Sequence, residues 1–455
     1  MAASGVDGAS ATSLLEEEAL GRRTLRKAGW RLIPLLSVCY MVAFMDRANI
    51  SFAALQMNRD LHFNAGIYGF GAGVFFVSYA ICELPSNLLL LRFGARRWIA
   101  RIMLTWGLLA AAMVFVRTPA SFYILRFLLG MAEAGFFPGV IYYLSIWFPL
   151  EMRSRAISRF YIALPLSNVL MGLIAGSLLS LNGRLGLKGW QWLFLVEALP
   201  AILLSVVVWR ALPDGPGDAQ WMEPEERAWL LAKLREDAEA VARSGGHSGT
   251  HAGLLRTMSR ILTEPRVALI GVYMFFTLGS LYAFSFSAPA IFIAATGWST
   301  NQVGVLIAGA ALVGAAAMLL VSWHSDRAQV KVPYIVGFSL LTAVAFGVSG
   351  VVREPWILVS ALAVATTSYY AVQGPSLSLS QTFLEGPSAA IGIAAINMMS
   401  IIGGFVGPNW MGWSIQHTGG TRLGTGMLFL PYALGAALIL VVQQRSGQRS
   451  VSPIG

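Results

Sequence analysis

Residues 38–55 read VCYMVAFMDRANISFAAL, an apolar run long enough to enter a lipid bilayer but with Asp46 and Arg47 at its centre. A charged side chain in the middle of a bilayer costs roughly 2.5–3.5 kcal/mol even on the most lenient insertion scale. The stretch therefore raises two questions. The first is whether the chain is a membrane protein, and the second is what these two charges do inside the membrane.

The composition answers the first question. Of the 455 residues, 56% are hydrophobic and only 12% are charged, whereas soluble domains carry about 25% charged residues. This predicts a polytopic membrane protein rather than several soluble domains. The net charge of +10 does not indicate a nucleic-acid binder, because Lys and Arg stand between apolar runs and form no basic face. The spacing of Cys and His predicts neither a disulfide framework nor a metal site.

A scan for apolar runs of about 20 residues predicts an all-α protein with twelve membrane-spanning helices. The predicted spans are 31–54, 66–91, 97–116, 119–147, 156–181, 190–212, 266–296, 302–322, 333–352, 355–384, 388–413 and 424–443. The fourth, tenth and eleventh contain Gly and Pro, and we expect these three helices to be interrupted.

A polar segment separates the sixth span from the seventh and divides the chain into two six-helix bundles. We expect a short charged helix from about Glu223–Pro224, followed by a flexible linker. The predicted organisation is a cytoplasmic tail at 1–30, a bundle at 31–212, a cytoplasmic linker at 213–263, a second bundle at 264–443 and a cytoplasmic tail at 444–455.

The distribution of Lys and Arg predicts the orientation. If both termini and the linker are cytoplasmic, 24 of the 32 basic residues lie inside, six lie outside and two lie within the membrane. Because cytoplasmic loops are enriched in Lys and Arg, we expect a multi-pass protein of the cell inner membrane with both termini in the cytoplasm. A monomer in contact with membrane lipid is expected.

Four charges lie within predicted spans of the first bundle: Asp46 and Arg47 in the first, Arg126 and Glu133 in the fourth. The last two are seven residues apart and share one helix face, roughly 10 Å apart along the axis. Such charges usually face the bundle interior and pair with one another. They are either salt bridges that only fix helix packing or parts of a substrate and proton pathway, and their concentration in one bundle favours the pathway.

Two further acidic residues, Glu83 and Glu197, lie nearer the polar ends of their spans, where capping or pairing with a loop Arg is favoured. The second bundle offers uncharged polar groups. An amide such as that of Asn397 must find a partner in hydrocarbon. Gln373 and Ser376 belong to a polar series in the tenth span that also includes Thr366, Tyr369 and Tyr370. Some of these groups will only join helices.

The loop after the second span carries a motif. Residues 87–97, NLLLLRFGARR, match the major facilitator superfamily signature Gly-x-x-x-Asp-Arg-x-Gly-x-Arg-Arg at Arg92, Gly94, Arg96 and Arg97. They depart from it at Asn87 and Leu91, where Gly and Asp are usual. The later stretch SWHSDRAQV keeps Asp326 and Arg327 at the corresponding point of the second half, as an internal repeat requires.

More specifically, the chain resembles the anion:cation symporter family of that superfamily, which includes carriers of 4-hydroxyphenylacetate, phthalate, tartrate and sugar acids. The matching stretches are FMDRANISFA, ELPSNLLLLRFGARRWIARIMLTWG, YILRFLLGMAEAGFFPG, KGWQWLFLVEALPA and AAIGIAAINMMSIIGGFVGP. The resemblance implies that Asp46 and Glu133 bind the coupling protons and that Arg47 and Arg126 engage or gate the anion. It also implies that Tyr79 and Asn397 contact the substrate.

These features predict a proton-coupled symporter, without a cofactor, that imports a small organic anion by alternating access. Two departures from the family pattern, Ser376–Leu377 in the tenth span and Leu164–Pro165 in the fifth, favour an aromatic or less hydroxylated carboxylate. A proton bound at Asp46 or Glu133 would free an arginine from an internal ion pair. The alternatives are an organic-anion or drug antiporter of the same fold, and an enzyme or channel. The spans show no nucleophile or metal constellation that would support an enzyme.

Overall fold

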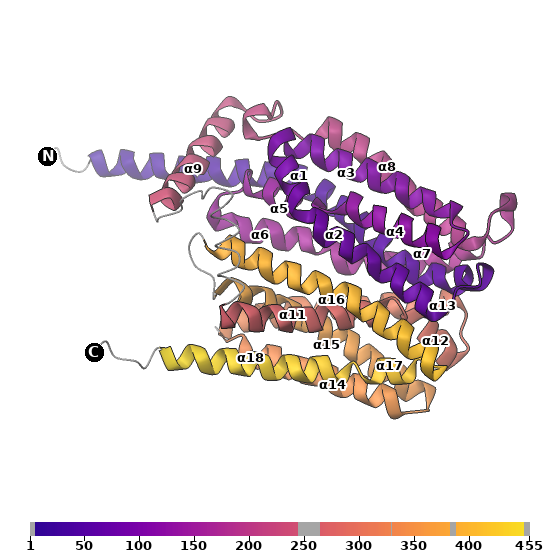
Figure 1. The fold of residues 1–455 in the computed structure, drawn as a ribbon. Helices are drawn as coiled ribbons and strands as arrows, with labels where there is room; N and C mark the ends of the chain where they lie inside the picture. Colours follow the sequence, from indigo (N-terminus) through magenta and orange to yellow (C-terminus); the bar gives the residue numbers. More distant parts are fainter. Residues whose placement is uncertain (1–4, 244–263, 329, 383–387, 450–455) are drawn as a thin grey trace.

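The structure, a computed structural model, describes residues 5–243, 264–328, 330–382 and 388–449. All regular elements in these ranges are helical (Figure 1). The α-helices of the first half are α1 (Gly5–Asp60), α2 (Ala65–Phe93), α3 (Ala95–Ala112), α4 (Pro119–Glu133), α5 (Phe136–Ser145), α6 (Leu150–Tyr161), α7 (Ala163–Leu179), α8 (Gly189–Ala211) and, in the linker, α9 (Pro224–Arg243). Those of the second half are α11 (Pro265–Ser285), α12 (Ala288–Thr296), α13 (Thr300–Ala328), α14 (Val332–Val351), α15 (Pro355–Thr382), α16 (Ser388–Thr418), α17 (Arg422–Gly426) and α18 (Phe429–Arg449).

Within the described part of the chain, 11 helical stretches are long and apolar enough to cross a membrane. They coincide with every predicted span except the eleventh. That span corresponds to α16, a helix of 31 residues that packs along α2 and α11. A helix of this length, about 46 Å, exceeds the roughly 30 Å hydrocarbon thickness of a bilayer. With α16 as the remaining span, the predicted fold class of twelve helices in two bundles is confirmed.

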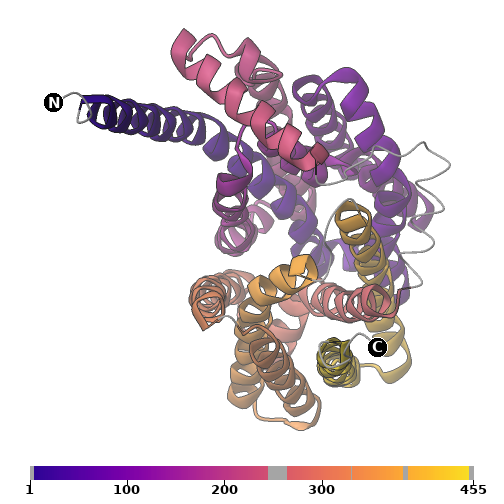
Figure 2. The same cartoon turned by 90° about the vertical axis from the view of Figure 1, so that its left-hand side faces the viewer.

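The two halves of the chain form two groups of helices. In Figure 1 both termini lie at the same end of the molecule, and we call this end the terminal face. Figure 2 looks onto that face, with the indigo-to-magenta helices on one side and the orange-to-yellow helices on the other. The groups meet chiefly where α2 runs beside α16 and α7 beside α13. Any site that serves both halves must therefore lie between these two helix pairs.

Only one of the three expected helix interruptions is present. The fourth span breaks after Glu133, and Gly135 adopts a left-handed φ of +87° before α5 begins. A side chain at residue 135 would strain this backbone conformation, and its Cβ would overlap the Ser86 side chain. The interruptions expected in the tenth and eleventh spans are wrong. In α15 and α16 the helix continues through Pro375 and Pro408, as membrane helices permit where neighbours satisfy the freed carbonyl groups.

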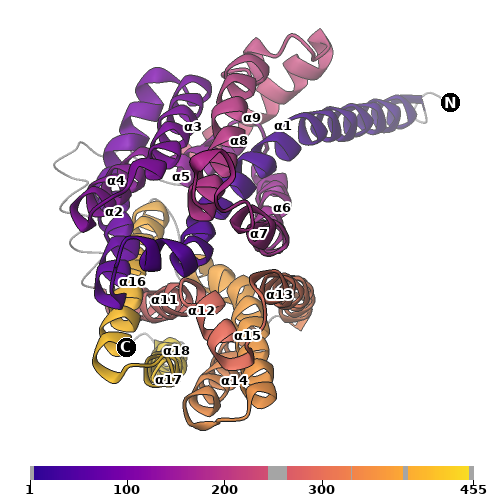
Figure 3. The same ribbon diagram turned by 90° about the vertical axis from the view of Figure 1, so that its right-hand side faces the viewer.

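The halves touch backbone to backbone near the face opposite the terminal face (Figure 3). A Cβ added at Gly69 of α2 would lie 2.5 Å from the Pro408 carbonyl oxygen of α16. Gly172 of α7 and Gly304 of α13 are so close that a Cβ on either would overlap the other's carbonyl oxygen. The Tyr68 hydroxyl donates a 2.8 Å hydrogen bond to the Phe286 carbonyl of the other half. The structure is therefore closed at this face.

The helix expected in the linker is present as α9, and it lies against the terminal end of α1. Glu226 of α9 pairs with Lys27 at 2.7 Å and with Arg23 at 3.4 Å. The Trp229 side chain packs so closely on Gly21 that a Cβ at that glycine would overlap its ring. The first bundle thus carries α9 on its terminal face. The segment expected to be a flexible linker, 244–263, lies outside the described residues.

Candidate functional site

The charged residues predicted to lie inside the membrane come together in the first bundle. Arg47 of α1 donates from Nε to Glu133 Oε1 at 2.7 Å, and its Nη2 lies 2.5 Å from the same oxygen. Glu133 is fully buried, and 14% of the Arg47 side chain is exposed. Glu133 Oε2 has no hydrogen-bond partner among the described residues. The pair therefore joins α1 to the end of α4 and leaves one acidic oxygen free.

Arg47 also reaches toward the second half of the molecule. Its guanidinium lies 5.0 Å from the ring centroid of Tyr79 and 5.5 Å from that of Phe75, both on α2. Tyr282 of α11 is close enough to interact with it. Such cation–π contacts are worth about 0.5–2 kcal/mol each, depending on desolvation. They hold the cation beside the interface between the halves, and they place Tyr79, which the resemblance assigned to substrate contact, next to a positive charge.

Asp46 lies on another side of α1 from its neighbour Arg47. It is 3% exposed and accepts hydrogen bonds from Trp106 Nε1 at 3.1 Å and from Asn49 Nδ2 at 3.2 Å. No Lys or Arg nitrogen of the described residues lies within 4 Å of its carboxylate. Arg126 is the cation that interacts with it most strongly. Asp46 is thus a buried acid held by neutral donors.

Arg126 does not form the close ion pair with an acid that the sequence suggested. Its guanidinium is 1% exposed and donates to the carbonyl oxygens of Gly71 and Ala72, each at 3.3 Å. It lies 4.8 Å from the centroid of the Phe75 ring. Backbone carbonyls of α2 therefore carry much of its hydrogen bonding. This arrangement ties α4 to α2.

The two acids that the sequence assigned to capping or to a loop Arg have other surroundings. Glu83 of α2 accepts a 3.0 Å hydrogen bond from Asn397 Nδ2 of α16, across the interface between the halves. Glu197 is the ninth residue of α8, too far along the helix to cap it. It is 4% exposed and has no ion pair among the described residues. Both assignments are wrong, because helix packing places the side chains against other helices and away from the loops.

The other predicted residues are spread over the second half and the terminal face. Ser376 shares a 2.9 Å hydrogen bond with Tyr273 inside the second bundle, and Gln373 lies half-buried one turn earlier on α15. Arg96 pairs with Asp214 at 3.2 Å. Gly94 has a left-handed φ of +86° at the turn between α2 and α3, which explains the glycine of the motif. Arg92, Arg97, Asp326 and Arg327 also lie near this face.

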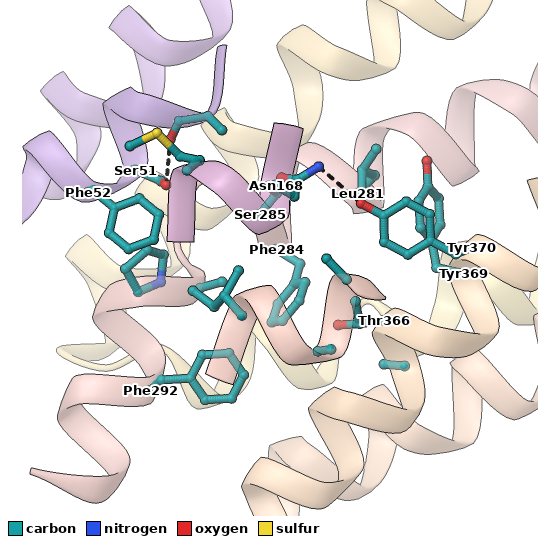
Figure 4. Close-up of a pocket in the computed structure, with 18 of the residues that line it drawn as sticks. Ser51, Phe52, Asn168, Leu281, Phe284, Ser285, Phe292, Thr366, Tyr369 and Tyr370 are labelled. Atoms are coloured by element: carbon teal, nitrogen blue, oxygen red, sulfur yellow. Dashed lines mark hydrogen bonds between the residues drawn. The ribbon is translucent and has the colours of Figure 1, made fainter. Parts of the chain in front are cut away.

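A cavity lies between the two halves (Figure 4). The cavity has a volume of about 70 Å³. This is enough for roughly five water molecules or a small organic molecule. Asn168 of α7 donates a 3.1 Å hydrogen bond to the Tyr370 hydroxyl of α15 across it. The polar and aromatic lining residues include Ser51, Phe52, Asn168, Thr366, Tyr369, Tyr370 and Tyr432.

The eight residues predicted to bind protons or substrate do not line this cavity. Arg47 comes nearest in the chain, because the adjacent Ala48 belongs to the lining. The polar series of the tenth span had pointed to Thr366, Tyr369 and Tyr370. Asn168 was missed, because a single amide in an apolar run gives no sign of the helix that it will face. The acids therefore lie outside the cavity, and α1 contributes to both regions, through Asp46 and Arg47 on one hand and Ala48 on the other.

Comparisons with known proteins agree with this fold. Residues 36–408 match the family model described as Major Facilitator Superfamily. The chain is 42% identical over 95% of its length to a protein named "Putative tartrate transporter" from Agrobacterium vitis, of which it covers 94%. It is 37% identical over 91% of its length to a "Quinolone resistance transporter" from Acinetobacter baumannii, of which it covers 93%. It is 33% identical over 84% of its length to the "Inner membrane transport protein RhmT" of Escherichia coli, of which it covers 87%.

Solved structures give the same architecture at low sequence identity. A bacterial homologue of the human lysosomal transporter Spinster superposes with a TM-score of 0.74 and 15% identity, over 93% of this chain and 98% of that one. The xylose transporter XylE of E. coli superposes with a TM-score of 0.69 and 14% identity, over 91% and 97% of the two chains. The chain therefore belongs to the major facilitator superfamily, and it is a multi-pass secondary transporter rather than an enzyme.

Proposed function

We propose that this transporter is a proton-coupled symporter that imports a small carboxylate across the cell inner membrane, with both termini in the cytoplasm. The observation that carries the proposal is the ion pair between Arg47 and Glu133. Arg47 is a partly buried cation next to the interface between the halves, and its guanidinium is bound to an acid. A substrate anion can bind the Arg47 guanidinium only if Glu133 releases it.

A proton can make that exchange. The free oxygen of Glu133, Oε2, can take up a proton, and the neutral carboxyl group then holds Arg47 far less strongly. The guanidinium becomes available for the charge-assisted, bidentate hydrogen bonds that it forms best with carboxylates. Buried acids bind protons more readily than acids in water, because burial disfavours the charged form. Proton binding would thus precede anion binding.

Asp46 supplies a second proton site. Its carboxylate rests on two neutral donors, Trp106 and Asn49, so protonation breaks no salt bridge there. A monoanion that enters a cell with a negative interior moves uphill by about 2.3 kcal/mol per 100 mV. Two protons carried with a monoanion move one net positive charge inward, which the membrane potential favours, and two protons carried with a dianion such as tartrate move no net charge against the potential.

The substrate class is drawn from the cavity and the relatives. The Tyr369, Tyr370 and Tyr432 side chains offer rings that can stack on an aromatic acid and hydroxyl groups that can bond a hydroxy acid. The sequence favoured an aromatic or less hydroxylated carboxylate. The relative from A. vitis bears the name of a tartrate transporter, which favours a hydroxy dicarboxylate. Tartrate is therefore the first substrate to test, with an aromatic carboxylate second.

The second candidate function is an antiporter that exports organic anions or drugs. The relative named as a quinolone resistance transporter, 37% identical, is the observation that favours it. An antiporter would be stimulated by a counter-substrate on the opposite side of the membrane. It would also move its cargo against the direction of proton flow, whereas the symporter moves both together.

The test uses purified protein in proteoliposomes and compares wild type with Asp46→Asn and Glu133→Gln. Both substitutions should abolish uptake driven by a pH gradient, because neither amide binds a proton, and should leave some substrate exchange at equal pH. Glu354→Gln, at an exposed loop position, is the matched control and should behave as wild type. Undiminished gradient-driven uptake in both variants would refute the symport mechanism.

A further inference from the structure

The cavity between the two halves has no charged side chain among the described residues that line it. The lining is apolar or aromatic, with a few hydroxyl and amide groups, and contains no Asp, Glu, Lys, Arg or His. A carboxylate enclosed there would have no counter-charge, and an unpaired charge is costly to bury. The lining does reach α1 at Ala48, which follows Arg47 in the chain. The cavity therefore suits the uncharged part of an anion whose carboxylate binds Arg47.

One hydrogen bond crosses this cavity from one half of the molecule to the other (Figure 4). Asn168 Nδ2 of α7 donates to the Tyr370 hydroxyl oxygen of α15 at 3.1 Å, and the same nitrogen donates to the Leu164 carbonyl oxygen at 3.3 Å. Because a carbonyl oxygen can only accept, the bond to Leu164 fixes which end of the Asn168 amide faces it. The Tyr370 oxygen must then accept from Asn168, and the proton of the Tyr370 hydroxyl points elsewhere.

This bond leaves two complementary groups unused. Among the described residues, no donor bonds the Asn168 amide oxygen and no acceptor bonds the Tyr370 O–H. Both side chains line the cavity. The Tyr370 side chain is also held in place, since it is 6% exposed and a Cβ at Gly314 of α13 would lie 2.5 Å from its ring. A fixed acceptor and a fixed donor thus lie side by side, one on each half of the molecule.

A hydroxyl group of the substrate matches this pair. Its O–H can donate to the Asn168 amide oxygen, and its own oxygen can accept from the Tyr370 O–H. An ionised carboxylate only accepts and an ammonium group only donates, so each satisfies one of the two groups. A methylene group satisfies neither and leaves both polar groups unpaired in an enclosed cavity. A site of this kind discriminates strongly against an analogue that lacks the hydroxyl group.

We propose that Asn168 and Tyr370 form a hydroxyl-binding subsite that selects carboxylates with a hydroxyl group over those without one. The inference rests on the proposed function and narrows its substrate class to hydroxy carboxylates. Because α7 and α15 belong to different halves, a hydroxyl group bound at both residues also adds a link between the halves. Loss of either residue should therefore weaken the binding of hydroxy acids and leave the binding of other acids unchanged.

The test compares the uptake of tartrate with that of succinate, the same dicarboxylate without hydroxyl groups. In wild type, kcat/KM for tartrate should exceed that for succinate by about tenfold or more. Tyr370→Phe and Asn168→Leu should each bring this ratio to about one, through a higher KM for tartrate and an unchanged KM for succinate. The double variant should lose little more than either single variant, because one hydroxyl group bonds both residues. Tyr142→Phe, at an exposed position of α5, is the matched control and should keep the wild-type ratio.

A second measurement needs neither a variant nor a proton gradient. Thermal-shift titration of purified wild type compares tartrate with succinate and with dimethoxysuccinate, in which methyl groups replace the hydroxyl protons, and compares 4-hydroxyphenylacetate with phenylacetate. In at least one series the hydroxy acid should bind about tenfold or more tightly than its partner. If that series is the dicarboxylates, dimethoxysuccinate should bind as weakly as succinate.

The two measurements together decide the inference. A variant that still takes up succinate is folded, and a wild-type tartrate preference in both Tyr370→Phe and Asn168→Leu would overturn the subsite. If the variants take up neither acid, the wild-type titration decides: equal affinity within both series, or binding of none of these acids, would overturn it. If wild-type uptake ignores the proton gradient, the proposed function fails, and the titration still decides whether the cavity selects a hydroxyl group.

Discussion

Arg47 places both of its bonds on one oxygen of Glu133: Nε lies 2.7 Å and Nη2 2.5 Å from Oε1, and Oε2 is left without a partner. The usual pairing of Arg with a carboxylate uses both oxygens in parallel. Here one oxygen holds the cation and the other is free to accept a proton. In the proposed function this geometry combines an anion site and a proton site in one pair, and the consequences of that proposal can be tested.

The guanidinium of Arg47 should not be replaceable by an ammonium group. In Arg47→Lys the protein should fold, because Lys can still pair with Glu133, but it loses the planar fork that binds a carboxylate. We expect the KM for the transported anion to rise about tenfold or more. Uptake kinetics and substrate-induced thermal shift measure the change. Arg353→Lys, at an exposed loop position, should leave both unchanged, and an unaltered KM in Arg47→Lys would remove Arg47 from the anion site.

The hydrogen bond between Glu83 and Asn397 joins the two halves at 3.0 Å. Asn397→Asp replaces its donor with a second carboxyl group, and two carboxylates this close cannot both be ionised at low cost. We expect substrate exchange by this variant to fall at neutral and alkaline pH and to recover as acidification puts a proton between the two acids. Asn397→Ser, which keeps a donor without a charge, should show no such recovery. Equal pH dependence of the two variants would contradict this role.

The contact between Gly172 and Gly304 closes the face opposite the termini. Gly304→Val adds side-chain atoms where the Gly172 carbonyl already lies, so it should disfavour the closed state and lower the transport rate. Gly309→Val, on the same helix but with open space around its Cβ, is the matched control. The measurement is labelling of Ser51→Cys in the cavity by a thiol reagent added outside, after replacement of Cys39 and Cys82. Faster labelling is expected in Gly304→Val only, and equal rates in both variants would refute closure at this contact.

The docking of α9 should depend on pH through Glu226, which lies outside the membrane. Burial alone would raise its pKa, but hydrogen bonds from Lys27 and the Glu223 backbone N–H, with the charge of Arg23, bring the pKa below the usual value for a glutamate side chain. Because the pKa of Glu226 is lower when α9 is docked, Glu226 stabilises docking fully at pH values above its pKa in the unfolded chain. This stabilisation is lost as the pH falls through the pKa of Glu226 in the folded protein. The protection of Pro224–Arg243 against hydrogen exchange, measured relative to an unstructured peptide at the same pH, should therefore be constant from about pH 8 to pH 5 and fall below about pH 4.

Glu226→Gln should lower that protection at neutral pH as well, because the amide no longer attracts Lys27 and Arg23. Glu236→Gln removes an acid from an exposed pair with Lys233 on the same helix. Exposed pairs contribute little, so this control should behave as wild type. If the two variants show the same exchange, the docking of α9 does not depend on Glu226.

Local features of the sequence predicted the helices well, because the length of an apolar run is set by the bilayer and not by other parts of the chain. The break after Glu133 was also local, since Gly135 needs a left-handed φ. The continuity of α15 and α16 was not predictable, because a proline inside a helix is tolerated only where neighbours compensate. The partners of Arg126, Glu83 and Glu197 depend on which helices meet, and a single sequence does not specify that.

The most direct test of proton-coupled import follows protons and substrate in the same vesicles. Wild-type proteoliposomes containing a pH-sensitive dye, at equal pH on both sides, receive tartrate or an aromatic carboxylate from outside. Acidification of the interior that accompanies substrate entry, and that is absent in Glu133→Gln, is the predicted result. Substrate entry without any movement of protons would contradict it.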